Sequence, residues 1–186
     1  VLRDEIARLA AQRDSTLLEV VTDAVRRMQR DQWWSGVHEA LDAMNPEELA
    51  EYRAETDQLD GLRQTVCVGT EPTCRRGDVW LTDLGIDPAD PEQAFVRPAL
   101  IVSDNSLHHP KLNMVVIVPG TSKVRGLPMH VLAHPNAGTG LDVPTSFQIE
   151  QVRSVSTRRL IRRLGRLRTE QQHAIDDVLK HVLSLH

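Results

Sequence analysis

The sequence is poor in aromatic residues and in cysteine. Phe, Trp and Tyr together make up 3% of the 186 residues. Many proteins bind single-stranded nucleic acid by stacking bases on aromatic rings, and so few rings make a surface of that kind unexpected here. The two cysteines, Cys67 and Cys74, lie seven positions apart in a polar stretch with Gly and Pro. We expect free thiols in a loop, because no further ligands for a metal ion stand nearby.

Long apolar runs are also missing. A helix that spans a bilayer needs about 20 apolar residues, and no run in this chain approaches that length. No basic start followed by an apolar segment marks a secretion signal. The chain begins inside a helical pattern, so we expect the natural start to lie upstream. At 40% apolar and 26% charged residues, the composition is that of an ordinary soluble domain or of two small ones, with no membrane partner.

The formal charge of −4 is unevenly distributed. Residues 1–64 contain 8 Lys and Arg against 14 Asp and Glu, whereas residues 65–186 contain 14 against 12. An acidic segment joined to a mildly basic one suits an inhibitor that occupies a polyanion-binding site. Two ordinary solvated surfaces would carry the same charges, and charge alone favours that simpler interpretation.

The first third of the chain has helical periodicity. Apolar residues at helical spacing predict a helix over residues 1–13, which Asp14-Ser15-Thr16 interrupts. Thr16 with Glu19 forms a capping-box pattern that starts a second helix. The pattern continues as far as Met44, and Asn45-Pro46 predicts the start of a further helix. One face of the second helix is apolar and comprises Leu17, Val20, Val21, Ala24, Val25 and Met28.

Periodicity ends at Asp60-Gly61. Residues 65–74 contain Gly and Pro without a repeating pattern, and we interpret them as a linker or as the N-terminal arm of the next domain. The predicted organisation is therefore a helical segment over residues 1–64, this connection, and a second domain over residues 75–186.

The second domain is predicted to be α+β. Short apolar or alternating runs predict strands over residues 79–84, 99–102, 114–118 and 130–133, one half-buried strand over 147–155 with a possible bulge, and a short strand within 160–167. Thr169 with Gln172 is expected to cap a last helix. Its apolar face comprises Ile175, Val178, Leu179, Val182 and Leu183. Such a pattern suits a small barrel-like sheet covered by a helix.

Polar groups stand at the ends of several of these strands. They lie in four segments, which are Arg75–Trp80, Arg97–Ser103, Val118–Ser122 and Gln148–Arg153. In order and spacing these segments resemble the MazF family of bacterial toxins. The resemblance implies an SH3-like small β-barrel with a C-terminal helix, as in MazF, CcdB and Kid. It also implies a cytoplasmic homodimer that cleaves single-stranded RNA as an mRNA interferase, with no cofactor and no metal.

The residues themselves suit this chemistry. RNA can be cleaved without a metal ion because its own 2′-hydroxyl can attack the adjacent phosphorus. Arg97 offers a permanent cation whose fork matches two phosphate oxygens, and Pro98 restricts it to an extended backbone. Thr121 offers a hydroxyl on a stiff, branched side chain.

The resemblance assigns roles to further positions. It implies that Arg97 and Thr121 are the catalytic pair and that Glu92 acts as the base toward the 2′-hydroxyl. It also implies that RNA is bound by Ser122, Gln151, Arg153 and Arg76. The chain departs from the family pattern in two places. In the loop from Gly85 to Val96, the glycine that the family usually has before the glutamate is missing ahead of Glu92. Gly120 stands where a bulkier apolar residue is usual before Thr121.

Residues 1–64 resemble a truncated ribbon-helix-helix antitoxin of the MazE or VapB kind. In such proteins a preceding β-strand enters the DNA major groove, and that strand is missing here, so we do not expect operator DNA to bind. From His38 to Asp60 the chain has eight acidic residues and one Arg. The resemblance implies that this acidic tail inhibits the toxin, in cis or in trans. A natural fusion, an engineered fusion and two chains written as one would share this sequence.

Other functions remain open from the sequence. A CcdB-like toxin would share the barrel yet poison gyrase by binding it, and a DNA-binding regulator could use the barrel only for dimerisation. A two-histidine ribonuclease or a zinc site is disfavoured, because His108, His109, His130 and His134 lack the spacing of either. A basic run is consistent with a phosphate track, with a solvated face or with a contact to the acidic tail. This run comprises Arg158, Arg159, Arg162 and Arg163.

Overall fold

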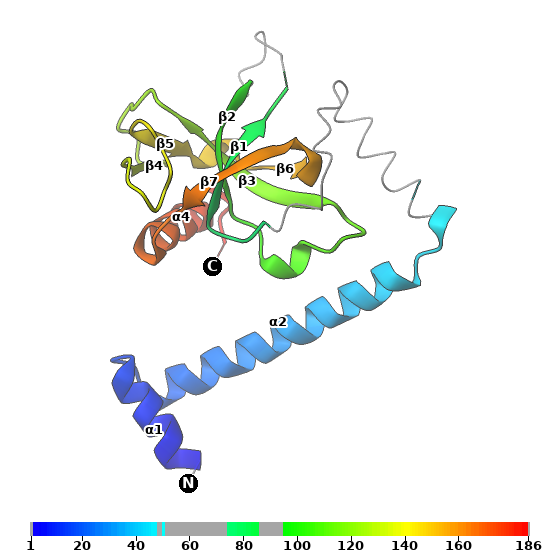
Figure 1. Ribbon diagram of the computed structural model, residues 1–186. Helices are drawn as coiled ribbons and strands as arrows, with labels where there is room; N and C mark the ends of the chain where they lie inside the picture. Colours follow the sequence, from blue (N-terminus) through cyan, green and yellow to red (C-terminus); the bar gives the residue numbers. More distant parts are fainter. Residues whose placement is uncertain (1, 48–49, 51–73, 86–94, 186) are drawn as a thin grey trace. The chain divides into compact units, whose positions relative to one another are not determined.

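The computed structural model describes residues 2–47, 50, 74–85 and 95–185 (Figure 1). The chain divides into two compact units, Val1–Ala50 and Glu51–His186. Each unit is described by itself below. The predicted boundary at residues 65–74 falls outside the described part except for Cys74, and it stays a prediction.

The N-terminal unit is helical, as its periodicity predicts. Helix α1 spans Leu2–Gln12 and packs against α2, which spans Leu17–Ala43. The capping box is confirmed: the Thr16 hydroxyl accepts the Glu19 N–H at 3.2 Å, and the Glu19 carboxylate accepts the Thr16 N–H at 2.7 Å. Asn45 caps the next helical turn by accepting the Glu47 N–H at 2.9 Å. Much of the apolar face of α2 stays exposed, including Leu17, Val21, Val25 and Met28.

The C-terminal unit contains a seven-stranded sheet whose strand pairs are all antiparallel. The order is β4-β5-β3-β2-β1-β7, and β6 pairs with β3 beside this path. The strands are β1 (Asp78–Asp83), β2 (Val96–Ile101), β3 (Met114–Thr121), β4 (His130–Ala133), β5 (Thr145–Gln148), β6 (Arg153–Ser156) and β7 (Leu160–Arg166). Three short 3-10 turns, η1 (Asn105–Leu107), η2 (Ile149–Gln151) and η3 (Thr157–Arg159), and helix α4 (Thr169–Val182) complete the described part of the unit.

Strands β1 to β4 confirm four of the predicted strands, and β7 is longer than the short strand expected there. The single strand predicted over 147–155 is wrong. The chain breaks into β5 and β6 around η2, where the Val152 N–H bonds the Ile149 carbonyl at 3.1 Å. Phe147 and Ile149 are both fully buried, and the turn between them and β6 lets the chain leave one half of β3 and join the other.

The predicted cap of the last helix is also wrong by one residue. Arg168 is the N-cap, with extended backbone angles, and its N–H donates to the Gln171 side chain at 3.4 Å. Leu167 is buried and donates its N–H to Gly77, so the chain leaves β7 extended through Arg168 and the helix begins at Thr169. Gln172 donates instead to the Leu167 carbonyl at 2.8 Å.

Two groups of buried apolar side chains stabilise the sheet. The first joins α4 to the sheet through Ile175, Val79, Leu100, Val118 and Phe147. The second lies on the other face of the central strands and comprises Cys74, Trp80, Leu84, Ala99, Ile101, Val115, Ile117, Val155 and Leu160. Alternating positions of β1, β2 and β3 supply the two groups, as the period of a strand requires.

The loop that follows β4 packs against β7. The Gly138 carbonyl accepts the Arg166 N–H at 2.7 Å. Gly140 has φ +62°, and a Cβ at this position would overlap the backbone carbonyl of Leu164. The strands at the two ends of the sheet order are therefore linked through this loop.

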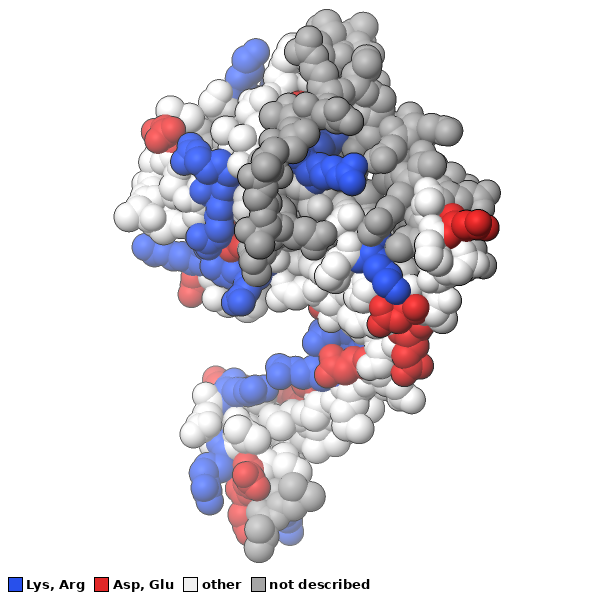
Figure 2. Space-filling model, turned by 45° about the vertical axis from the view of Figure 1, so that its right-hand side comes forward, with Lys and Arg blue, Asp and Glu red and all other residues white. Residues whose placement is uncertain are grey.

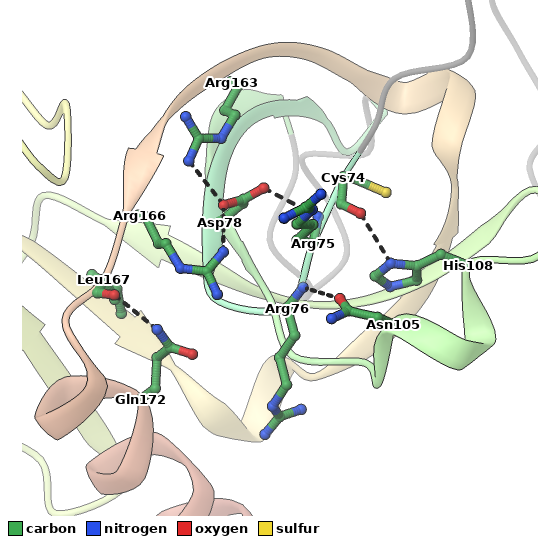
Figure 3. Close-up of polar contacts among 10 residues, drawn as sticks. All are labelled: Cys74, Arg75, Arg76, Asp78, Asn105, His108, Arg163, Arg166, Leu167 and Gln172. Atoms are coloured by element: carbon green, nitrogen blue, oxygen red, sulfur yellow. Dashed lines mark hydrogen bonds and ion pairs between the residues drawn. The ribbon is translucent and has the colours of Figure 1, made fainter. Parts of the chain in front are cut away.

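A half-buried histidine, His108, ties Cys74 to the sheet. His108 Nδ1 lies 3.1 Å from the Cys74 carbonyl, and its Nε2 lies 2.8 Å from the Ser103 hydroxyl (Figure 3 draws the first contact). A carbonyl can only accept, so Nδ1 carries the proton and Nε2 accepts from Ser103. Burial lowers the pKa of His108 below its usual value of 6.5, partly offset by the Cys74 bond and by Asp104 and Asp78.

The lowered pKa of His108 predicts that the folded unit loses stability in acid. Below pH 6.5 the unfolded chain protonates His108 while the folded chain resists, so the free energy of unfolding should fall as the pH drops from 6.5 toward the lower folded pKa. Denaturant unfolding at pH 7.5 and 5.5, followed by circular dichroism, measures the loss. The loss of unfolding free energy between the two pH values should be smaller in His108→Gln. It should persist in His134→Gln, since His134 is exposed. An equal loss in wild type and His108→Gln would contradict this account.

Candidate active site at the ends of β2 and β3

Arg97 and Thr121 are brought together by strand register. In the β2–β3 ladder, Ala99 lies opposite Pro119 and Ile101 opposite Ile117. Both strands continue beyond that ladder, to Val96 and to Thr121. Continued by two residues past the end of that ladder, the same register would set Arg97 opposite Thr121, and the Cβ atoms of such cross-strand neighbours are about 5 Å apart. Two residues that are 24 positions apart in sequence thus share one face of the sheet.

Arg153 approaches the same point from β6. It lies opposite Ile117, so its side chain belongs to the same face of β3 as Thr121. The pKa of Arg97 is lowered, mainly by burial and also by the positive charge of Arg153. Arg97 stays protonated at neutral pH, since a guanidinium does not lose its proton in proteins. Two neighbouring guanidiniums repel each other, and a bound anion such as a phosphate would relieve that repulsion.

The hydroxyl of Thr121 can donate to such an anion. Thr121 is half-buried, and its Oγ1 accepts the N–H of Lys123 at 3.2 Å, which fixes the side chain while leaving the hydroxyl proton free to be donated. Ser122 follows and is exposed.

Gly120 explains one departure from the family pattern. A Cβ at this position would lie 2.6 Å from the Thr145 methyl group and 3.1 Å from the Pro98 carbonyl oxygen. The bulkier residue usual in the family would collide with both. Glycine therefore lets the end of β3 lie directly against Pro98, the residue that follows Arg97.

Gln151 lies at the corner where β3 changes partners. The first half of β3 pairs with β6 and its last two residues pair with β5. Gln151 ends η2, the turn that joins those two strands, and is half-buried two residues before Arg153. The structure thus places Gln151 and Ser122 on turns that adjoin the group of Arg97, Thr121 and Arg153.

Glu92 lies outside the described residues, so its role stays a prediction. The roots of its loop are joined: Leu84 donates its N–H to the Phe95 carbonyl at 3.2 Å, and Phe95 donates to Gly85 at 2.7 Å. Because Thr82 pairs with Arg97, these roots lie at the same end of β1 and β2 as Arg97.

Arg76 is not brought to this group. Its guanidinium pairs with Asp176 of α4, and its N–H donates to Asn105 at 2.8 Å. Gly77 bonds Ile101, at the far end of β2 from Arg97. Arg76 thus precedes the opposite end of β1, six residues and roughly 20 Å of strand from Thr82, the partner of Arg97.

The arrangement around Asp78 was not predicted from the sequence. This carboxylate is buried at the start of β1, and its Oδ1 lies 3.0 Å from both Arg163 and Arg166 of β7. Its Oδ2 accepts the N–H of Arg75 at 3.1 Å (Figure 3). The available signal was an acidic residue at the buried start of a strand together with an arginine-rich strand elsewhere, and only the pairing of β1 with β7 joins them.

The alternative metal site is not supported in the part of the chain that the structure describes. No group of three or more His, Cys, Asp or Glu side chains there could hold a metal ion. His108 bonds Ser103 and Cys74, whereas His130 pairs with Glu150 at 2.8 Å. Among the described helices, none is long and apolar enough to cross a membrane.

Comparison with known proteins identifies relatives of the C-terminal unit. Endoribonuclease MazF9 of Mycobacterium tuberculosis is 36% identical over 117 residues, which are 60% of this chain and 97% of that protein. Endoribonuclease MazF of Staphylococcus epidermidis is 30% identical over 113 residues, which are 60% of this chain and 92% of that protein.

Solved structures show the same fold. MazF of Deinococcus radiodurans (crystal form I) matches with a TM-score of 0.53 and 20% identity, over 61% of this chain and 98% of that one. A MazE–MazF structure from the same organism (form II) matches with a TM-score of 0.50 and 22% identity, over 62% of this chain and 99% of that one. The predicted resemblance of the C-terminal domain is confirmed, since the family model of the PemK-like, MazF-like toxins matches residues 75–183. With four motif segments, the sheet, the closing helix and these relatives in agreement, this chain belongs to the MazF-like toxins of type II toxin–antitoxin systems.

Proposed function

We propose that this chain is a metal-independent, sequence-selective endoribonuclease that cleaves single-stranded RNA. The observation that carries the proposal is that Arg97, Thr121 and Arg153 belong to one face of the sheet, with Arg153 near enough to act on the charge of Arg97. Its relatives are named endoribonucleases, in agreement with the enzyme class expected from the sequence.

The proposed reaction is attack of the 2′-oxygen on the adjacent phosphorus. The phosphorus–2′-oxygen bond forms as the bond to the 5′-oxygen breaks, giving a 2′,3′-cyclic phosphate and a 5′-hydroxyl. Arg97 donates hydrogen bonds to two non-bridging oxygens as negative charge builds on them, and the Thr121 hydroxyl donates a hydrogen bond to the same group. Glu92 is the proposed base that takes the proton of the 2′-hydroxyl, and the leaving 5′-oxygen takes a proton from solvent water. Arg153, Gln151 and Ser122 would hold the flanking RNA.

Arg76 is retained only as a weaker candidate for RNA binding. Its pairing with Asp176 already offsets its charge, and it stands apart from Arg97. We propose that it links α4 to the start of β1 and that RNA binding depends on it little.

The finer features of the assembly are proposals too. We expect the sheet to close as an SH3-like barrel and the toxin unit to form a homodimer. We expect residues 1–64 to act as an antitoxin segment, because the segment is acidic where the toxin unit is mildly basic. The exposed apolar face of α2 fits a helical segment that functions against another surface.

Removal of the N-terminal segment tests this arrangement. Residues 65–186 should cleave a long defined RNA at least tenfold faster than the full chain, because the proposed inhibitor is gone. Sequencing of the RNA ends should show 2′,3′-cyclic phosphates at a recurring motif. Activity should be unchanged in EDTA.

Three outcomes would count against the proposal. Loss of activity in EDTA would contradict the metal-independent reaction. Equal cleavage by the two forms would contradict inhibition by residues 1–64. Intact RNA together with tight binding to DNA gyrase would favour the CcdB-like alternative.

A further inference from the structure

The guanidiniums of Arg163 and Arg166 are held as a pair by one carboxylate, that of Asp78. Both lie 3.0 Å from Oδ1 of Asp78, whose carboxylate is 3% exposed. The hydrogen bond to Asp78 raises the pKa of Arg163. Each guanidinium has five N–H donors in a fixed fork, and the contact with one oxygen occupies only part of that set. The side chains are 49% and 45% exposed, so the remaining donors can reach a ligand from solvent.

The surroundings of this pair are strongly positive. From residue 158 to 168 the chain contains six arginines and no acidic residue. Arg168 follows the pair in the chain and is exposed, whereas Arg162 lies opposite Leu81 and belongs to the other face of β7. Figure 2 shows Lys and Arg side chains gathered on the face of the C-terminal unit that it presents. Asp78 offsets one charge and fixes two, which lowers the entropy cost of binding a further anion.

Strand register relates this pair to the candidate active site. Asp78 and Thr82 are both even positions of β1, so their side chains lie on one face, and Thr82 pairs with Arg97. Arg166 lies opposite Asp78, and Arg163 lies opposite Trp80 on the same face. Four residues of β1 separate the two points, which is roughly 13 Å. An RNA strand would have to extend by a few nucleotides to reach both.

We propose that Arg163 and Arg166 are a second phosphate subsite, which holds the RNA backbone outside the cleaved bond. The inference rests on the proposed RNA substrate. In this proposal β7 contributes affinity for longer RNA, independent of its sequence. Cleavage itself depends on Arg97 and Thr121. Asp78 is the positioning residue of the subsite, since it orients both guanidiniums and would not itself touch RNA.

The salt dependence of binding tests this subsite. The probe is a 15-nucleotide RNA with 2′-O-methyl groups throughout, which cannot be cleaved, and the dissociation constant of the full chain is measured across salt concentrations. Each lost phosphate contact on a single strand lowers the slope of log K against log salt by about 0.7. Arg163→Gln and Arg166→Gln should each show this loss and bind roughly fourfold more weakly at 0.15 M salt. Each variant leaves Asp78 one guanidinium.

Two comparisons keep the test decisive. Lys180→Gln removes a charge from an exposed residue of α4 and should leave the slope unchanged. If a glutamine variant melts before the measurement, Arg163→Lys keeps a cation for Asp78 and should bind more weakly with an unchanged slope, because the fork is lost.

Two results would overturn the subsite: slopes equal to wild type in both glutamine variants, or a polyglutamate peptide whose binding depends on the pair while that of RNA does not. The second would assign the pair to an acidic peptide. Failure of the proposed nuclease function would appear differently, as absence of cleavage by any form of the chain.

Discussion

Replacing Arg97 by alanine should lower the rate of RNA cleavage by about 10²–10³-fold or more, because the residue supplies donors where charge develops on the phosphorane. Its pKa, lowered by burial and by Arg153, reflects a partly desolvated cation, whose interaction with a phosphate is stronger than that of an exposed one. Single-turnover cleavage of one defined RNA by residues 65–186 measures the effect. Arg97→Lys should recover only part of the rate, since an ammonium lacks the fork.

The cross-strand pairing with Thr121 adds a second requirement. Thr121→Val should lose about 1–3 kcal/mol of transition-state stabilisation, whereas Thr121→Ser should retain most activity. The double variant should lose less than the sum of the two single losses, because both side chains act on one phosphate group. Lys180→Ala serves as the matched loss of a charge on α4. Full activity of Arg97→Ala would contradict the proposed mechanism. Strictly additive losses would show that Arg97 and Thr121 act independently and not on one phosphate group.

Replacing Gly140 by alanine should destabilise the toxin unit by about 3 kcal/mol or more. The residue has φ +62°, which costs an alanine about 1 kcal/mol or slightly more. Its Cβ would also overlap the backbone carbonyl of Leu164 in β7, and a backbone cannot rotate away as a side chain can. The melting temperature should fall by roughly 9–12 °C, at about 3–4 °C per kcal/mol for a unit of this size.

Gly126 provides a matched control. It has φ +66°, yet a Cβ there would meet nothing within 4 Å. Gly126→Ala should therefore show only the backbone cost of about 1 kcal/mol. Thermal unfolding followed by circular dichroism compares the two variants. Similar melting temperatures would show that the contact between the loop after β4 and β7 contributes little.

The gap between prediction and structure is clearest where segments distant in sequence meet. The motif of Arg97-Pro98 and the hydroxyl of Thr121 could be chosen from local chemistry at strand ends. Arg76 looked equivalent by the same reasoning, yet it pairs with Asp176, 100 residues later in the chain. No role was predicted for Asp78, because its partners Arg163 and Arg166 stand more than 80 residues away in the sequence. A charge in a motif shows what a residue can do, and its neighbours decide what it does.

Local structure followed the sequence where short-range interactions dominate. The capping box of Thr16 and Glu19 involves residues three apart, so the sequence contains all of it. The prediction of one strand over 147–155 was wrong. The alternation of apolar and polar residues could not show that β3 pairs with two separate strands at its two ends.

The sequence by itself determined most of the helical and strand segments, the family of residues 75–183 and the chemical groups available at the strand ends. These depend on periodicity, capping and side-chain type, which are properties of neighbouring residues. Only the tertiary structure decided that Arg97, Thr121 and Arg153 belong to one face of the sheet and that Asp78 holds two arginines. Those relations depend on register between strands, and a slip of one residue would turn each side chain to the opposite face of the sheet.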